Sequence, residues 1–177
     1  IESVGGQVIL FVENSIQFYS AILPYLYKHV FVQSRSFMTE ALNEHEQMLR
    51  MRGRPKILLA RNYEEAKDLY DKYKRNILGV VSDVRFEREG EIDATAGLKL
   101  ASYMRSQDRF LPIILESSEE VNREASKQLA AVFINKNSKT MHLELKEAVT
   151  TTFGFGEFHF VDPDTKWVVA VIKNLKD

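Results

Sequence analysis

Short runs of apolar residues alternate along this chain with longer segments in which apolar residues recur every three or four positions. Runs of about five consecutive apolar residues are typical of strands that are buried on both faces of a parallel sheet. The three-to-four spacing is typical of amphipathic helices. The strands expected from this pattern are residues 7–12, 56–60, 77–81, 111–115 and 130–134.

Helices are expected after each of these strands, and polar residues such as Ser15, Asn62 and Ser138 stand where an N-cap is needed. Strands that alternate with helices favour an α/β fold with a parallel sheet covered on both faces. The sequence therefore predicts a three-layer, doubly wound (βα)5 domain. Its expected strand order is the flavodoxin-like order 2-1-3-4-5.

The first connection, residues 14–54, is too long for a simple crossover. Pro24 lies inside its helical pattern and should kink the helix or move its start, and residues 33–36 are the expected break. A single helix of ~35 residues would be ~50 Å long, which exceeds the depth of a sheet. The extra segment therefore thickens the core or forms a homodimer surface, and the sequence leaves both alternatives open.

The pattern changes after residue 150, so we divide the chain into a domain at 1–150 and an extension at 151–177. The extension predicts a β-hairpin that turns near residues 161–165. An isolated hairpin is marginally stable, so this one should pack on the domain, pair with a second copy or begin a further domain. Because no initiator Met is present, we expect the chain to be a fragment or a processed form.

Composition excludes several classes of function. The 177 residues carry a net charge of −1, so no global field favours nucleic acid or an acidic membrane surface. The chain has no Cys, which excludes disulfides and thiolate chemistry, and its four His residues lack metal-ligand spacing. No apolar run reaches the length of a membrane span and no signal peptide is evident, so we expect a cytoplasmic protein.

Asp83 follows the third apolar run directly, and this makes it the leading candidate for chemistry. Open α/β sheets place their ligand sites at the carboxyl ends of the strands. An Asp at such a place can equally well cap the next turn, so Asp83 alone decides nothing.

Polar residues also follow the other strands that should neighbour the third strand. Glu13 and Asn14 follow the first strand, Ser117 the fourth and Lys136 the fifth. All carboxyl ends of a parallel sheet lie at one edge, so these side chains should converge on Asp83. The second strand ends on Ala60 and Arg61 without a carboxylate or hydroxyl, as suits a position at the edge of the sheet.

Four pieces of sequence, in this order and at these strand ends, resemble the receiver domain of two-component response regulators, the CheY-like family. They are FVENS, VVSDVRF, LPIILESS and VFINKN. The resemblance covers about residues 7–149, apart from the enlarged first crossover. It implies a signalling domain that accepts a phosphoryl group rather than an enzyme that turns over a substrate.

The resemblance implies a role for each matching residue. Asp83 would accept a phosphoryl group from the phosphohistidine of a histidine kinase or phosphotransfer protein. Lys136 would pair with the phosphoryl group, and Ser117 would donate a hydrogen bond to it. Phe133 would be the aromatic switch residue that turns inward as the hydroxyl moves. The phosphorelay would then switch a partner or an attached output domain.

The resemblance also implies Mg²⁺, held by Glu13, Asn14, Asp83 and the backbone carbonyl of Arg85. The family usually has a second acid at the position of Asn14, so Mg²⁺ should bind weakly here. The usual Pro after the lysine is replaced by Asn137.

Three alternatives remain from the sequence. The neutral Asn14 allows a pseudo-receiver that is never phosphorylated and serves as a binding module. The long crossover and the tail that ends mid-pattern allow a regulatory N-terminal domain of a larger enzyme of the phosphoenolpyruvate-synthase type. A small phosphatase with Asp83 as nucleophile fits poorly, because Arg85 occupies the place of its second acid.

Overall fold

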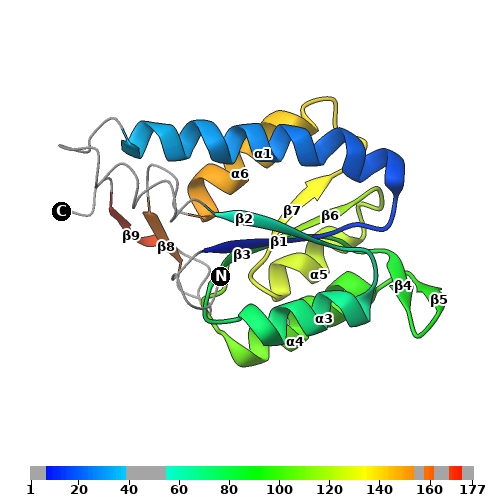
Figure 1. The fold of residues 1–177 in the computed structure, drawn as a ribbon. Helices are drawn as coiled ribbons and strands as arrows, with labels where there is room; N and C mark the ends of the chain where they lie inside the picture. Colours follow the sequence, from blue (N-terminus) through cyan, green and yellow to red (C-terminus); the bar gives the residue numbers. More distant parts are fainter. Residues whose placement is uncertain (1–6, 39–54, 154–157, 162–167, 173–177) are drawn as a thin grey trace.

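The computed structural model describes residues 7–38, 55–153, 158–161 and 168–172, and its centre is a five-stranded sheet (Figure 1). All the strands are parallel, in the order β2-β1-β3-β6-β7. This order confirms the doubly wound fold that the sequence predicts. The strands are β1 (Val8–Val12), β2 (Lys56–Ala60), β3 (Ile77–Asp83), β6 (Ile113–Ser117) and β7 (Val132–Asn135).

Helices cover both faces of this sheet, which gives the expected three layers (Figure 1). One face carries α1 (Ile16–Met38) and α6 (Met141–Thr152). The other carries α3 (Tyr63–Tyr73), α4 (Ala96–Gln107) and α5 (Asn122–Gln128). The expected N-cap of α3 is present, because the backbone N–H of Glu65 donates to Asn62 Oδ1 at 2.8 Å.

Alternate residues of each strand fill two separate cores. Ile9 and Phe11 of β1 face α1 and α6, whereas Leu10 and Val12 pack with α3 and α4. Because the side chains of a strand alternate between faces, this register also fixes where Glu13 points. It continues the Ile9–Phe11 series onto the face that carries α1 and α6.

Helix α1 passes without interruption through residues 33–36, so the break expected there is wrong. The helix begins at Ile16, ahead of Pro24, and Ser15 Oγ accepts from the backbone N–H of Phe18 at 3.3 Å. Burial of an apolar stripe against the sheet outweighs the hydrogen bond that Pro24 removes. That stripe contains Ile22, Leu26 and Val30. Residues 39–54 of the predicted crossover lie outside the described residues.

The segment that follows Asp83 has secondary structure of its own. It forms a two-stranded antiparallel hairpin of β4 (Phe86–Arg88) and β5 (Glu91–Asp93). Positive φ angles of 56° at Glu89 and 82° at Gly90 are those of a type I′ turn, whose twist suits a tight hairpin. The backbone N–H of Glu89 also donates to Glu64 Oε1 at 3.0 Å, which ties the hairpin to the start of α3.

The C-terminal extension contains the predicted hairpin, formed by β8 (Phe158–Val161) and β9 (Val168–Ile172). Its turn residues, 162–167, lie outside the described part of the chain. Ser138 does not cap the last helix as expected, because α6 begins only at Met141, and Ser138 Oγ accepts instead from the backbone N–H of Thr140. Among the described residues, no helix is both long and apolar enough to cross a membrane.

Candidate functional site

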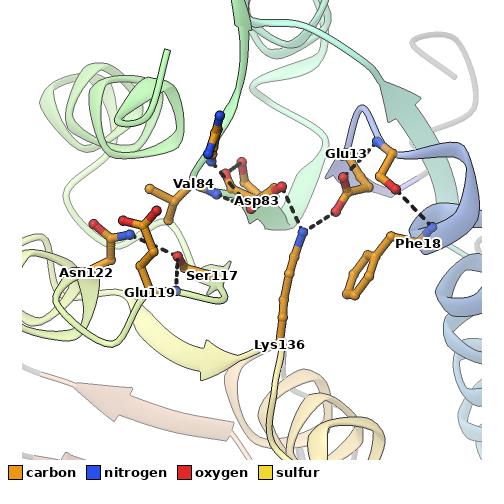
Figure 2. Close-up of polar contacts among 11 residues, drawn as sticks. Glu13, Phe18, Asp83, Val84, Ser117, Glu119, Asn122 and Lys136 are labelled. Atoms are coloured by element: carbon orange, nitrogen blue, oxygen red, sulfur yellow. Dashed lines mark hydrogen bonds and ion pairs between the residues drawn. The ribbon is translucent and has the colours of Figure 1, made fainter. Parts of the chain in front are cut away.

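A single ammonium group joins two strands at the carboxyl edge of the sheet. Lys136, just after β7, reaches across the edge and lies 2.8 Å from Asp83 Oδ2 and 2.6 Å from Glu13 Oε2, measured from Nζ (Figure 2). These three residues come from the ends of β7, β3 and β1. The predicted convergence of Glu13, Asp83 and Lys136 is therefore present in the structure.

Asp83 is the last residue of β3, and its carboxylate is fixed from two sides. Oδ1 accepts from the backbone N–H of Val84 at 2.7 Å and of Arg85 at 3.4 Å, while Oδ2 faces Lys136. Only 8% of Asp83 is exposed. The carboxylate thus has a defined orientation, and 11% of its side chain remains exposed.

The first turn of α4 lies against the backbone of Asp83. Gly97 is buried there, and its N–H donates to the carbonyl of Val84 at 2.8 Å. A Cβ at position 97 would collide with the Asp83 carbonyl oxygen and the Val84 Cα. A glycine is therefore needed where the helix approaches the strand end that carries the carboxylate.

Glu13 is fully buried, and its two carboxylate oxygens have separate partners. Oε1 accepts from the backbone N–H of Ser15 at 2.9 Å, and Oε2 pairs with Lys136. Burial raises the pKa of Glu13 and the nearby charge of Asp83 raises it further, whereas Lys136 opposes both. The ammonium is the group that allows two carboxylates to stand together here.

Lys136 is held as a cation by its neighbours. Burial alone would lower the pKa of Lys136, but the charges of Asp83 and Glu13 outweigh burial and raise it. The ring of Phe18, from the first turn of α1, lies 4.0 Å from Nζ and adds a cation–π contact. Sequence reasoning missed Phe18, because nothing in the helical pattern marks a ring that lies over a distant lysine.

Ser117 is the last residue of β6, one strand beyond Asp83, and only 4% of it is exposed. Its backbone carbonyl accepts from the N–H of Lys136 at 2.9 Å. Its hydroxyl oxygen accepts from the backbone N–H of Glu119 at 3.0 Å and from Asn122 Nδ2 at 2.9 Å. The structure therefore places Ser117 at the predicted edge of the sheet (Figure 2).

Phe133 lies in β7, opposite Leu115 in the sheet register. Leu115 belongs to the core under α3 and α4, so Phe133 lies on that face, away from Lys136. It is half-buried, and the Arg123 guanidinium lies 4.7 Å from its ring centroid. The structure thus joins Glu13, Asp83 and Lys136 directly and places Ser117 on the neighbouring strand, whereas Phe133 faces away from them.

Glu116 lies beside the cluster of Glu13, Asp83 and Lys136, and the sequence analysis did not single it out. It lies inside β6, paired in register with Asp83, and is fully buried. Neither carboxyl oxygen has a hydrogen-bond partner. Burial raises the pKa of Glu116 to about 8, against the opposing charge of Lys136, so the group is neutral at pH 7. Its place two residues after Ile114, on the face of α1 and α6, was the available signal.

The donors for a divalent cation are of the right chemical type. Glu13 and Asp83 supply carboxylate oxygens at one edge, while Asn14 is half-buried and Arg85 is exposed in the adjoining loops. Hard oxygen donors of this kind suit Mg²⁺, which keeps several waters and needs few protein ligands. In the described part of the chain, no group of three or more His, Cys, Asp or Glu side chains is arranged to hold a metal.

Solved structures share this architecture. A response regulator receiver domain protein from Clostridium thermocellum superimposes with a TM-score of 0.58 at 12% identity, covering 84% of this chain and 94% of that one. A receiver protein from Sinorhizobium medicae WSM419 gives the same score at 15% identity, covering 84% and 95%.

The chain has the receiver fold. The receiver domain of a sensor histidine kinase from Pseudomonas aeruginosa PAO1, with magnesium coordinated in its active-site cleft, also matches this fold, at a TM-score of 0.55 and 17% identity. That match covers 84% of this chain and 98% of the other. No family model and no curated protein matches the sequence, so this likeness is one of three-dimensional structure.

Proposed function

We propose that this chain is a signalling receiver that accepts a phosphoryl group on Asp83 from a histidine kinase or a phosphotransfer protein. The bridge from Lys136 Nζ to Asp83 and Glu13, with the Ser117 hydroxyl one strand away, is the observation that carries the proposal. It supplies a nucleophile, a fixed cation and a hydrogen-bond donor at a single edge, which are the groups that phosphoryl transfer needs.

In the proposed step, an Asp83 carboxylate oxygen attacks the phosphorus of a phosphohistidine. An O–P bond forms, the P–N bond breaks, and the imidazole leaves with the bonding electron pair. Lys136 stabilises the transferred negative charge, since its ammonium already contacts Asp83 Oδ2. The backbone N–H groups that fix Oδ1 keep the attacking carboxylate oriented.

Glu13, Asn14, Asp83 and the carbonyl of Arg85 are the groups that we propose to hold Mg²⁺. When bound, the metal would neutralise part of the charge on the incoming phosphoryl oxygens. Asn14 supplies an oxygen without a charge, so the affinity should be lower than that of a site with three carboxylates.

Intact-protein mass spectrometry tests the proposal after incubation with Mg²⁺ and a small phosphodonor such as acetyl phosphate. We expect a mass increase of one phosphoryl group in the wild-type chain and none in Asp83→Asn. Glu87→Gln, in the exposed hairpin, is a matched control that should behave as wild type. An equal mass increase in Asp83→Asn would contradict the assignment of the acceptor.

A second candidate function, a binding module that is not phosphorylated, is favoured by Asn14 and by the Lys136 ammonium that already pairs with both carboxylates. The variant Asn14→Asp distinguishes a phosphorylated receiver from an unphosphorylated binding module. If weak metal binding is the only deficit, the added carboxylate should lower the Mg²⁺ dissociation constant about tenfold or more, and it should accelerate phosphorylation. Isothermal titration and the mass assay measure both effects. A gain in Mg²⁺ affinity without any phosphorylation would favour the binding module.

A further inference from the structure

The hydroxyl of Ser117 has an unusually restricted set of hydrogen bonds. Its oxygen accepts from the Glu119 backbone N–H at 3.0 Å and from Asn122 Nδ2 at 2.9 Å. A serine hydroxyl has two acceptor lone pairs and one O–H donor. With both lone pairs occupied, the hydroxyl is left with its O–H as the only group that can act on a ligand.

Asn122 is a rigid donor. It is the first residue of α5 and only 8% of it is exposed. Its backbone N–H donates to the carbonyl of Glu119 at 3.1 Å, and its own carbonyl accepts from the Ser126 hydroxyl at 2.7 Å. Ser126 is fully buried. The backbone of Asn122 is therefore held in place, and its side-chain amide lies beside Ser117, as Figure 2 shows.

We propose that Asn122 is a positioning residue that restricts Ser117 to donating its hydroxyl hydrogen to a phosphoryl oxygen on Asp83. This inference rests on the proposed function of Asp83 and deepens it. The amide N–H of Asn122 occupies the lone pair of Ser117 Oγ that Glu119 leaves open, so the O–H cannot be consumed by a protein acceptor on that side. The hydrogen bond to a phosphoryl oxygen then forms without reorienting the hydroxyl.

Reversing the polarity at position 122 is the sharpest test. Asn122→Asp has nearly the same shape, but its ionised carboxylate only accepts hydrogen bonds, so it takes the Ser117 hydroxyl hydrogen for itself. Asn122→Ala removes the contact but leaves the hydroxyl free to turn. Asn122→Asp should therefore weaken ligand binding more than Asn122→Ala does. A residue with a purely packing role would not show this order.

The experiment is a double-mutant cycle on the full chain, read by titration with beryllofluoride and Mg²⁺. We expect Asn122→Asp to weaken beryllofluoride binding about tenfold more than Asn122→Ala when Ser117 is present. In the Ser117→Ala background the difference should shrink to the part caused by charge repulsion alone. Equal differences in both backgrounds, or no difference between the variants, would overturn the inference. Thermal unfolding of each variant establishes that it folds.

A second readout does not depend on phosphorylation. In NMR spectra of the unliganded chain, Ser117→Ala should shift the side-chain amide protons of Asn122, and Ser117→Thr, which keeps the hydroxyl, should largely restore them. Unchanged amide protons in Ser117→Ala would overturn the inference on their own. If the wild-type chain binds no beryllofluoride, the proposed function is contradicted. If it binds, but the difference in affinity between Asn122→Asp and Asn122→Ala is equal with and without the Ser117 hydroxyl, only the role of Asn122 is contradicted.

Discussion

Glu116 places a third carboxyl group next to Glu13 and Asp83, but in the neutral form. Both of its oxygens are buried without partners, and burial raises its pKa to about 8. A buried carboxyl that carried a charge would compete for Lys136, which already pairs with two carboxylates. The neutral state of Glu116 therefore preserves the pairing on which the proposed site depends.

The pKa of Glu116 makes the stability of the chain depend on pH. The folded state keeps this proton up to about pH 8, whereas the unfolded chain releases it near 4.5. The folded state thus binds more protons in this window, and the free energy of unfolding falls as pH rises through it. Each pH unit costs at most about 1.4 kcal/mol.

Glu116→Gln keeps the shape of the side chain and removes the titration. We expect the variant to gain stability relative to wild type as pH rises from 5 to 8, measured by urea unfolding at a series of pH values. Glu119→Gln replaces an exposed acid nearby and is the matched control, with no such trend expected. A constant difference between wild type and Glu116→Gln across this range would show that Glu116 does not titrate there.

Residue-level reasoning from the sequence succeeded where a strand end marks the residue. Asp83, Ser117 and Lys136 were placed at one edge because parallel strands end together. Glu116 was missed because the strand was expected to end at residue 115, whereas β6 continues to Ser117 and buries Glu116. Asn122 was missed because its role comes from a contact across a turn, which periodicity does not encode.

At the scale of elements, the junction between β3 and α4 is tightly packed. Gly97→Ala would drive a methyl group into the Asp83 carbonyl, and that backbone also bonds β3 to its neighbours. We expect a loss of about 1–3 kcal/mol in unfolding free energy, as for other overpacked sites, together with slower phosphorylation of Asp83.

The matched control for this junction is Ala101→Gly, a change of the same size on the buried face of α4 and away from the strand end. It should lower stability through helix propensity, by about 1 kcal/mol, and leave the rate of phosphorylation unchanged. Urea unfolding and the mass assay separate these effects. If Gly97→Ala were as stable and as readily phosphorylated as wild type, α4 would have to move away from β3 without cost, and the expected constraint would be contradicted.

The types of the main helices and strands were more predictable from the sequence than their boundaries or the short β4–β5 hairpin. The five strands and the cap at Asn62 follow from local pattern, because burial on both faces requires continuous apolar runs. The β4–β5 hairpin was missed, since Glu89-Gly90 lacks the Asn-Gly or Asp-Gly signal and Glu89 adopts a positive φ that its residue type does not announce. The continuity of α1 depends on packing against the sheet, which local sequence does not contain.

On the scale of the whole molecule, the two helices of one layer meet through a titratable contact. His29 of α1 is buried, and its Nε2 lies 2.9 Å from the hydroxyl oxygen of Thr150 on α6. Burial lowers the pKa of His29, and the charge of Lys146 lowers it further. The folded state therefore binds fewer protons than the unfolded state near pH 6.5, so stability falls as pH decreases through that region.

We expect the wild-type chain to lose stability on the acid side through His29, opposite in sign to the trend from Glu116. His29→Gln retains a group that can bond to Thr150 but does not titrate, so its stability should fall less between pH 7 and pH 5. Urea unfolding measures this, with His142→Gln as the control, since His142 is exposed on α6. Parallel pH profiles for wild type and His29→Gln would contradict the assignment.

Adjacent residues of α5, Asn122 and Arg123, contact Ser117 and Phe133 respectively. The first turn of this seven-residue helix therefore contacts Ser117, which we propose to bind the phosphoryl group, and Phe133, the proposed switch residue. Thermodynamic linkage makes such coupling reciprocal. A partner that binds this end of α5 more tightly when Asp83 is phosphorylated must, by the same factor, shift the equilibrium of the chain toward its phosphorylated form.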